Sequence, residues 1–283
     1  MADILNGREV SLKIKETLKK QIKTFQTPPK LAVILVGENP SSLIYIKSKE
    51  KTCLDLGIDF ELIKFAENVD SETIEHKIRE LNNDKRVHSI LVQCPLPNHL
   101  DSQKIIDIID PLKDVDGLTS SNISNLVNNY GVNVPCTPAG IIKLLDFYNV
   151  ELEGKHIVIV GRSNLVGKPL FHLLLNRNAT VTMCHSKTKD LKKFTKEADI
   201  LIVAVGKKDL INKEMIKENA ILIDVGINRK DGSKKIYGDI NFDDVFEKCS
   251  LITPVPGGIG PMTVMMMMNN VVKSYLTQND DVN

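Results

Sequence analysis

The sequence predicts an α/β protein with two domains. Short apolar runs alternate with helical patterns, and this alternation occurs in two separate series. Such alternation implies parallel sheets that are covered by helices on both faces. The length of 283 residues suits about two domains, which we expect to join near residues 130–150.

The first series contains three predicted strands. Leu31–Gly37 has the pattern of a buried strand, and the helix predicted at Pro40–Leu56 has Asn39 as a candidate N-cap and a proline at its first position. The same alternation predicts strands at Glu61–Phe65 and Ser89–Cys94, and helices at Ser71–Asn82, Gln103–Ile109 and Pro138–Tyr148.

The second series begins at Gly154. Its predicted strands are Ile157–Val160, Thr180–Cys184, Ile200–Val205 and Ile221–Val225. Its helices are expected at Pro169–Asn176, Leu191–Glu197 and Lys213–Glu218, with a final helix at about Val264–Leu276. We expect the methionine run Met265–Met268 to form a packed face of that final helix.

Composition argues against several classes of function. The net charge is +1 and there is no Trp, so nothing favours binding to nucleic acid or to an anionic membrane. The five cysteines form no CxxC pair, and no Cys/His spacing predicts a metal site. No apolar run approaches the roughly 20 residues that span a bilayer, and no apolar signal region opens the chain. We therefore expect a cytoplasmic protein.

The segment Thr253–Thr263 has an unusual composition. It contains three prolines and three glycines in eleven residues, without a charge. We expect neither a helix nor a central strand there, because proline fixes φ and lacks an N–H, whereas glycine permits positive φ. Two interpretations stay open: an ordinary connector, or the partly buried wall of a binding site.

A strand, a glycine turn and a helix follow one another at His156–Pro169. Gly161 ends the strand, Gly167 lies near the helix start, and Ser163 replaces the second glycine of a strict G-x-G-x-x-G motif. Backbone N–H groups and the positive helix end at such a turn bind phosphate. The motif predicts a nucleotide site, with a plain strand-to-helix turn as the alternative.

The loop after the next strand indicates which dinucleotide would bind. NAD sites place an acid about 20 residues on, where it holds the ribose 2′-hydroxyl. Here the first acid is Asp190, and it follows a run of polar and basic residues. Arg162 and Ser186, with His185 and Lys187 as further candidates, suit a 2′-phosphate and favour NADP. A solvated loop is the alternative.

Tyr45 and Lys49 are candidates for chemistry in the first domain. They lie four residues apart on the helix predicted at Pro40–Leu56, so they share one face. If this face borders a cleft, the pair could transfer protons, provided that burial lowers the pKa of the lysine. The alternative is a solvated helix face.

Polar residues also follow the third strand of the first series. Gln93 ends an apolar strand, at the strand end where ligands bind in open α/β sheets. Asp114 and Asp116 stand two residues apart in Lys113–Gly117. They could hold a metal, although no third ligand is near. A carboxylate here could instead accept paired N–H groups of a heterocycle, or the segment could be a polar turn.

Six motifs together resemble one known family over essentially the whole chain. They are Val36–Ser42, Tyr45-x-x-x-Lys49, Val92–Pro97, Lys113–Gly117, Val160–Gly167 and Pro254–Thr263. In this order they resemble the bifunctional methylenetetrahydrofolate dehydrogenase/methenyltetrahydrofolate cyclohydrolase family. Cys94 stands where leucine is common in that family, and Ile259 stands where valine is usual. Neither departure changes the implied chemistry.

The resemblance implies two reactions on tetrahydrofolate derivatives. NADP⁺ would take a hydride from 5,10-methylenetetrahydrofolate, and water would then open 5,10-methenyltetrahydrofolate to 10-formyltetrahydrofolate. Lys49 would be the general acid/base, neutral or sharing its proton, because an ammonium group would repel the cationic methenyl form. Gln93 would hydrogen-bond to Lys49, Tyr45 would stack on or position the folate, and Asp116 would bind the pterin amino and ring N–H groups.

The resemblance also implies further binding residues. Folate contacts are implied at Val92, Cys94, Pro256, Gly257, Gly258, Ile259 and Gly260. Cofactor contacts are implied at Gly161, Arg162, Ser163, Ser186 and Ile227.

The implied architecture is two α/β domains with a cleft between them. The first is a folate-binding catalytic domain at residues 1–140, on which the C-terminal helix in 264–283 packs back. The second is a Rossmann-like NADP-binding domain at 141–263, and family members are usually homodimers. A shikimate-dehydrogenase-like NADP oxidoreductase and a non-catalytic NADP-binding sensor are the alternatives.

Overall fold

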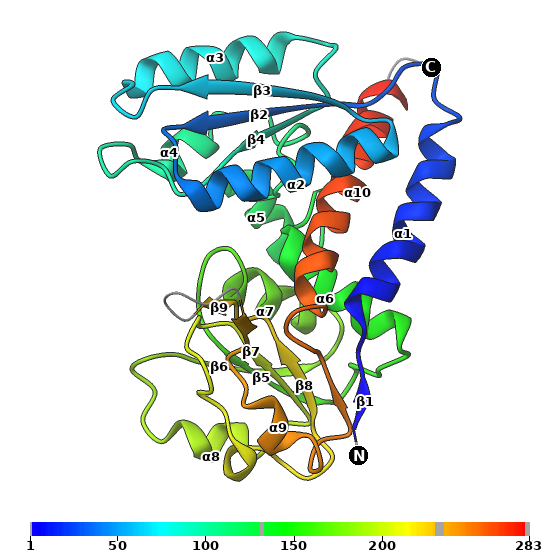
Figure 1. Cartoon of the computed structure of the whole chain (residues 1–283), viewed down its shortest axis with the longest axis vertical. Coiled ribbons are helices and arrows are strands. Elements are labelled where there is room, and N and C mark those ends of the chain that lie inside the picture. Colours follow the sequence, from blue (N-terminus) through cyan, green and yellow to red (C-terminus); the bar gives the residue numbers. More distant parts are fainter. Residues whose placement is uncertain (1, 131–132, 230–234, 281–283) are drawn as a thin grey trace. The chain divides into compact units, whose positions relative to one another are not determined.

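The computed structural model describes residues 2–130, 133–229 and 235–280, which divide into two compact units (Figure 1). The six-stranded unit contains the segment up to Leu12 and Thr137–Thr263, and the three-stranded unit contains Lys13–Cys136 and the segment from Val264. The division falls within helices α1 (Gly7–Ile22) and α10 (Ile259–Asp280). The segment before Lys13, which the sequence placed in the first domain, therefore groups with the second series.

The three-stranded unit is built on a parallel sheet in the order β3-β2-β4. Its strands are β2 (Lys30–Val36), β3 (Asp59–Phe65) and β4 (Ser89–Val92). Leu31–Val36 is buried without interruption, as expected for a parallel strand covered on both faces. Because the chain forms β3 on one side of β2 and β4 on the other, the strand order reverses beside β2.

Helices pack around this sheet. They are α2 (Pro40–Leu56), α3 (Ser71–Asn83), α4 (Ser102–Ile106) and α5 (Ser120–Val127), with parts of α1 and α10. Ala32 and Ile34 of β2 share a buried cluster with Ile74 and Ile78 of α3. Asp70 caps α3, since its carboxylate accepts the backbone N–H of the third helical residue at 2.7 Å.

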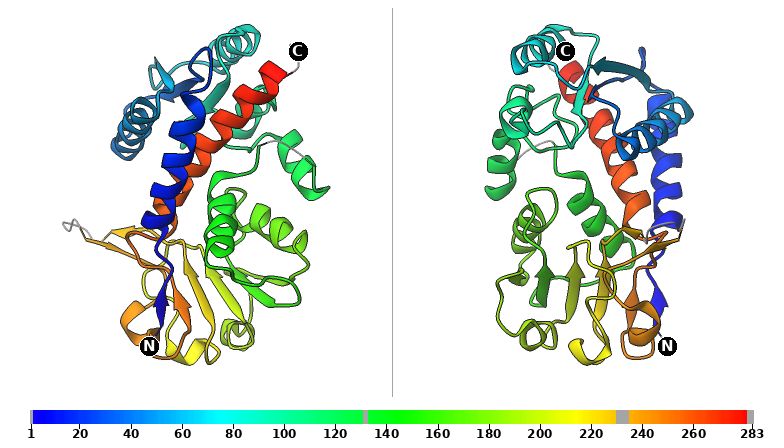
Figure 2. Two further views of the ribbon diagram at one scale, coloured as in Figure 1. Left: turned by 90° about the vertical axis from the view of Figure 1, so that its right-hand side faces the viewer. Right: turned by 60° about the vertical axis from the view of Figure 1, so that its left-hand side comes forward.

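The six-stranded unit contains a parallel sheet in the order β1-β11-β8-β7-β5-β6, which Figure 2 shows in two further views. Its strands are β1 (Asp3–Ile4), β5 (His156–Val160), β6 (Thr180–Cys184), β7 (Ile200–Val203), β8 (Ile221–Asp224) and β11 (Leu251–Ile252). β6 lies on one side of β5 and β7 on the other, so this sheet also has a point at which the strand order reverses. A separate antiparallel pair joins β9 (Asn228–Arg229) to β10 (Ile236–Tyr237).

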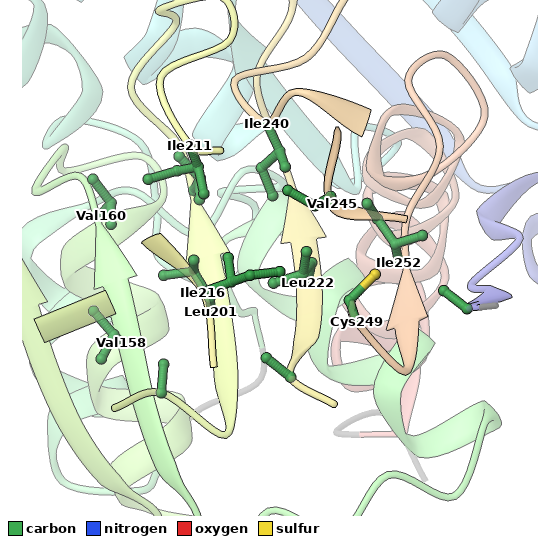
Figure 3. Packing of buried hydrophobic residues seen from close by; sticks show 14 of the residues in the cluster. Val158, Val160, Leu201, Ile211, Ile216, Leu222, Ile240, Val245, Cys249 and Ile252 are labelled. Atoms are coloured by element: carbon green, nitrogen blue, oxygen red, sulfur yellow. The ribbon is translucent and has the colours of Figure 1, made fainter. Parts of the chain in front are cut away.

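A layer of aliphatic side chains forms the core of the six-stranded unit. Figure 3 shows Val158, Leu201, Leu222 and Ile252, one from each of four strands, in this layer. The helical elements of the unit are α6 (Cys136–Phe147), which begins at the division between the units, α7 (Gly167–Leu175), α8 (Leu191–Thr195), η1 (Lys213–Met215) and α9 (Phe242–Val245). Within the described part of the chain, no helix is long and apolar enough to cross a membrane.

The structure confirms the predicted α/β class and contains the predicted strands of both series. The helix expected at Lys213–Glu218 is reduced to a single 3₁₀ turn at Lys213–Met215. The sequence did not predict β1, β11, α1, α5 or α9, nor the β9–β10 pair. β1 has only two residues and exists because Asp3 pairs with Leu251, which is distant in the sequence. No local sequence pattern therefore predicts it.

The prediction that Thr253–Thr263 contains no helix is wrong, because α10 begins at Ile259. Pro261 is the third residue of α10. The first four N–H groups of a helix have no partner within the helix, so a proline there sacrifices no hydrogen bond. The helix therefore starts inside the proline- and glycine-rich segment.

The part of this segment that precedes α10 is a tight turn. The N–H of Gly258 donates to the carbonyl of Pro254 at 2.8 Å, and the N–H of Arg8 donates to the carbonyl of Gly257 at 2.9 Å. Gly257 has φ +117°, and a Cβ at Gly258 would overlap Pro254. Both glycines are thus required by the backbone of the six-stranded unit.

Candidate active site

Lys49 forms a buried polar pair with Gln93 in the three-stranded unit. Lys49 lies on α2, is only 9% exposed, and its Nζ donates to Oε1 of Gln93 at 2.8 Å. The Nε2 of Gln93 donates in turn to the carbonyl of Cys94 at 2.7 Å. These two bonds fix the orientation of the amide, so that its oxygen faces the lysine. A solvated helix face is therefore excluded for Lys49.

The fold places this pair at a ligand-binding edge. Gln93 follows β4, and its backbone N–H donates to Ile34 of β2 at 2.9 Å, beside the point where the strand order reverses. Ligands in open α/β sheets bind outside the carboxyl ends of the strands at such a point. Gly37, with φ +73°, ends β2, and Asn39 Oδ1 accepts the N–H of Ser42 at 3.2 Å where α2 begins.

Tyr45 and Ser42 lie on the same helix as Lys49. Tyr45, one turn before Lys49, is 49% exposed, so its ring is available to a ligand. Ser42 is buried, and its Oγ has no hydrogen-bond partner among the described residues. A buried hydroxyl without a partner costs about 1–3 kcal/mol, and a polar ligand group would remove this cost.

Asp114 and Asp116 have different roles. The buried carboxylate of Asp114 accepts the backbone N–H groups of Gly117 at 2.9 Å and Thr119 at 2.8 Å, and the Nδ2 of Asn122 at 2.9 Å. Burial raises the pKa of Asp114, and these bonds oppose the rise. Asp114 therefore holds the turn together.

Asp116 has fewer partners. Within the described residues, Cys136 is the side chain that donates to its carboxylate, with Sγ to Oδ1 at 3.6 Å. Burial raises the pKa of Asp116, while the charge of Lys49 lowers it. Burial, and then the charge of Asp116, raise the pKa of the Cys136 thiol well above its ordinary value, so the thiol stays protonated and can donate. Most of the acceptor capacity of Asp116 remains for a ligand.

Asn270 is a supporting residue that the sequence reading missed. It lies on α10, is 2% exposed, and its Nδ2 donates to the carbonyls of Val115 and Val134, both at 2.9 Å. It also reaches the Sγ of Cys136 at 3.7 Å. Asn270 thus holds both the peptide before Asp116 and the thiol that bonds to it. The sequence feature that could have identified Asn270 is its position at the end of a methionine-rich helix pattern.

No metal centre is seen in the described ranges, where no three His, Cys, Asp or Glu residues are grouped to hold an ion. The oxygens of Asp114 are already bonded to N–H donors. Of the alternatives for these two acids, recognition of N–H groups by Asp116 fits the geometry best.

The glycine turn of the six-stranded unit is closely packed against neighbouring backbone. Gly161 ends β5 with φ +131°, and a Cβ on it would overlap the carbonyl of Ala204. A Cβ on Gly167 would overlap the carbonyl of Gly161. Ser163 Oγ accepts the N–H of Val166 at 3.1 Å just before α7, and Arg162 is exposed. The turn lies where the strand order reverses.

The loop after β6 is shaped by its own side chains. Thr188 Oγ1 accepts the N–H of His185 at 2.9 Å, and His185 Nδ1 accepts the N–H of Lys187 at 3.1 Å. Ser186 is exposed on this loop, which contains no carboxylate before Asp190. This arrangement fits a 2′-phosphate better than a free 2′-hydroxyl.

The predicted site residues lie in both units. Those in the three-stranded unit are Tyr45, Lys49, Val92, Gln93, Cys94 and Asp116, of which Val92 is buried within β4. Those in the six-stranded unit are Gly161, Arg162, Ser163, Ser186, Ile227 and Pro256–Gly260. Ile227 is 50% exposed. The folate contacts of Pro256–Gly260 stay a prediction.

One parallel α/β unit has a glycine turn of the kind that binds phosphate. The other α/β unit contains a buried Lys–Gln pair. Together these features define a dinucleotide-dependent enzyme. Two family models match the chain. Residues 5–116 match the catalytic domain of tetrahydrofolate dehydrogenase/cyclohydrolase, and residues 135–279 match its NAD(P)-binding domain. The chain belongs to the tetrahydrofolate dehydrogenase/cyclohydrolase family, whose bifunctional members act in one-carbon folate metabolism.

Individual relatives agree with this assignment. The chain is 51% identical over 276 residues to the bifunctional protein FolD of Mycoplasma mycoides subsp. mycoides, covering 96% of each chain. The crystal structure of the bifunctional enzyme FolD from Campylobacter jejuni is similar at TM-score 0.95 and 46% identity, covering 98% of this chain and 99% of that one. The FolD of Trypanosoma brucei, complexed with NADP cofactor and inhibitor, is similar at TM-score 0.93 and 33% identity, covering 100% of this chain and 99% of that one.

The shikimate dehydrogenase alternative shares the fold alone. The enzyme from Aquifex aeolicus is similar at TM-score 0.53 but is only 12% identical, covering 90% of this chain and 93% of that one. The resemblance that the six sequence motifs indicated is therefore confirmed at the level of the family.

Proposed function

We propose that this chain oxidises 5,10-methylenetetrahydrofolate with NADP⁺, and then adds water to the methenyl product to give 10-formyltetrahydrofolate and a proton. The observation that carries the proposal is the buried Lys49, whose Nζ lies 2.8 Å from Gln93 Oε1 at the carboxyl edge of the sheet. An amine that is held by an oriented amide oxygen is suited to proton transfer during a reaction at a neighbouring carbon atom.

Each side chain at this edge has a distinct task in the hydrolysis. Lys49 takes a proton from the attacking water and returns one to the ring nitrogen that leaves the methenyl carbon. Gln93 holds the Nζ in place, and it accepts a hydrogen bond while the amine still carries a proton. Asp116 accepts N–H groups of the pterin, and the exposed ring of Tyr45 packs on the folate.

The six-stranded unit fits NADP⁺. The turn at Gly161 offers backbone N–H groups to the pyrophosphate. Arg162 and Ser186 are exposed where the 2′-phosphate would lie, with no carboxylate between them and Asp190 on that loop. NADP⁺, when bound, accepts the hydride from the methylene bridge. The chain itself supplies binding and orientation through Gly161, Ser163 and Ile227.

We also propose a homodimer in the cytoplasm. The dimer follows from the family resemblance. The five cysteines are all free thiols, which suits a reducing compartment.

Replacing Lys49 tests the proposed chemistry. Lys49→Met should lower cyclohydrolase activity at least 100-fold, because the methionine fills the same space and cannot carry a proton. The measurement follows loss of methenyltetrahydrofolate absorbance, with folate binding determined separately by calorimetry. Lys47→Met is the matched control, since Lys47 is an exposed lysine of the same helix. Full hydrolysis by Lys49→Met would contradict the assigned role.

A further inference from the structure

A buried carboxylate lies behind the nucleotide edge of the six-stranded unit. Asp239 is 0% exposed, and it accepts three consecutive backbone N–H groups of the loop after β7. Its Oδ2 accepts from Val205 at 2.7 Å and from Gly206 at 3.0 Å, and its Oδ1 accepts from Lys207 at 2.7 Å. One side chain thus fixes the path of this loop.

The same carboxylate also holds the loop after β8. Nδ2 of Asn228 donates to Oδ1 of Asp239 at 2.9 Å. Gly226 lies so close to Asp239 that a Cβ on Gly226 would overlap the carboxylate. Ile227 is between these two residues. Asn228 is bonded to Asp239, whereas Gly226 packs against Asp239 and donates its N–H to Oδ1 of Asp224 at 2.9 Å.

A second buried acid holds Asp239 in place. Asp224, at the end of β8, is 4% exposed and accepts the backbone N–H groups of Asp239 at 2.9 Å and Ile240 at 2.8 Å. A Cβ on Gly238 would overlap the carboxylate of Asp224, which mirrors the contact of Gly226 with Asp239. Asp239 therefore packs against Gly226, and Asp224 packs against Gly238.

One of these two loops lies beside the glycine turn, and the other follows β8, the next strand of the sheet beyond β7. The N–H of Ala204 donates to the carbonyl of Val160 at 2.9 Å, and Gly161 lies against the carbonyl of Ala204. The loop of Val205 therefore starts beside the turn that would hold the pyrophosphate. Val205 is 41% exposed and Ile227 is 50% exposed. Two exposed aliphatic side chains at this edge offer apolar contact to a flat ring.

We infer that Asp239 is a positioning residue for the dinucleotide, and that it holds two loops so that Val205 and Ile227 contact a ring of the cofactor. Asp239 is buried and does not touch the cofactor itself. Val205 becomes a further contact residue that the family resemblance did not provide. This inference rests on the proposed function only in requiring that the six-stranded unit binds NADP⁺.

The test compares two properties of one variant. In Asp239→Asn the side chain keeps its size but loses one acceptor oxygen, and it turns an NH₂ group toward N–H donors. We expect its Kd for NADP⁺, measured by calorimetry, to rise at least 10-fold. Its cyclohydrolase kcat/KM should stay within twofold of the parent, because hydrolysis consumes no dinucleotide. Asp243→Asn, at an exposed aspartate of α9, should change neither property.

The outcomes distinguish failure of the proposed function from failure of the inference about Asp239. If the parent chain binds no NADP⁺, the proposed function fails. If the parent binds and Asp239→Asn binds equally well, or if both properties of that variant fall in parallel, the inference is overturned. If Asp239→Asn does not fold, Asn228→Ala decides. It removes one bond to the carboxylate, together with the bonds of Asn228 to the carbonyls of Tyr237 and Gly238, and leaves the acid in place. We then expect an approximately threefold rise in Kd for NADP⁺ with unchanged hydrolysis, and an unchanged Kd would overturn the inference.

Discussion

The two parallel sheets of this molecule each have a ligand-binding edge at the carboxyl ends of their strands, but the chemical groups at the two edges differ. In the three-stranded unit, the edge where the strand order reverses carries polar side chains, with Lys49 bonded to Gln93. In the six-stranded unit, the corresponding edge carries a glycine turn with backbone N–H groups, and Asp239 lies behind it. The fold thus determines where a ligand binds, and the local residues determine whether side chains or backbone recognise it.

This difference explains which substitutions each edge tolerates. A side-chain site loses function when a functional group is removed, although the backbone survives. A backbone site loses function when a side chain is added, because the added atoms occupy the space that the ligand or a neighbouring loop needs.

The largest expected effect comes from adding a methyl group at the backbone site. Gly161→Ala would place a Cβ on the carbonyl of Ala204, at φ +131°, where residues other than glycine are strained. We expect the NADP⁺ affinity to fall at least 100-fold and the cyclohydrolase activity to survive. The measurements are calorimetric titration with NADP⁺ and the methenyl absorbance assay.

The control for this change is Gly154→Ala. Gly154 also has positive φ, at +71°, but a Cβ there would meet no described atom within 4 Å. This variant should lose about 1 kcal/mol of stability and none of its affinity for NADP⁺. If the two variants bind NADP⁺ with equal affinity, the glycine turn does not act as a backbone site, and the two edges do not differ in the way described above.

The next effect is a pH dependence of stability in the six-stranded unit. Burial, together with the charge of Asp239, raises the pKa of Asp224 from 3.8 to about 6. Between these values the folded chain binds more protons than the unfolded chain, so the contribution of Asp224 to stability falls as pH rises. The loss reaches roughly 3 kcal/mol above the folded pKa.

The comparison with Asp224→Asn isolates this contribution. The free energy of unfolding of the variant, relative to the parent, should increase by up to about 3 kcal/mol between pH 4 and pH 7. Urea unfolding at a series of pH values measures it, and the shifts of acids that do not interact with Asp224 cancel in the difference. A difference that stays constant over this range would show that Asp224 does not titrate there.

The sequence predicted the parts of both edges that depend on neighbouring residues. Lys49, Gln93 and Gly161 stand at strand ends or at helical spacing, and these local patterns survive folding. Cys136 and Asn270 could not be predicted, because they act on Val115 and Asp116 only after distant segments pack together.

Helix boundaries show a similar limit. The composition of Thr253–Thr263 does not predict the start of α10 at Ile259, because proline and glycine disfavour a helix interior, although the first turn tolerates both. The supporting bonds of Asp239 were missed for a different reason. Its three N–H donors come from a loop that precedes it by some thirty residues, so no spacing rule connects them.

The smallest expected effect separates the two acids of the side-chain edge. Asp116→Asn should weaken folate binding by about 10- to 100-fold, since a charged hydrogen bond contributes roughly 1.5–3 kcal/mol. Its melting temperature should change little, because Cys136 is its donor within the described residues. Asp114→Asn should do the reverse, since the carboxylate of Asp114 accepts bonds from Gly117, Thr119 and Asn122. Folate calorimetry and thermal unfolding of both variants measure the contrast. If the two variants lose affinity and stability in the same proportion, Asp116 is a structural residue like Asp114, and the three-stranded edge recognises its ligand through other groups.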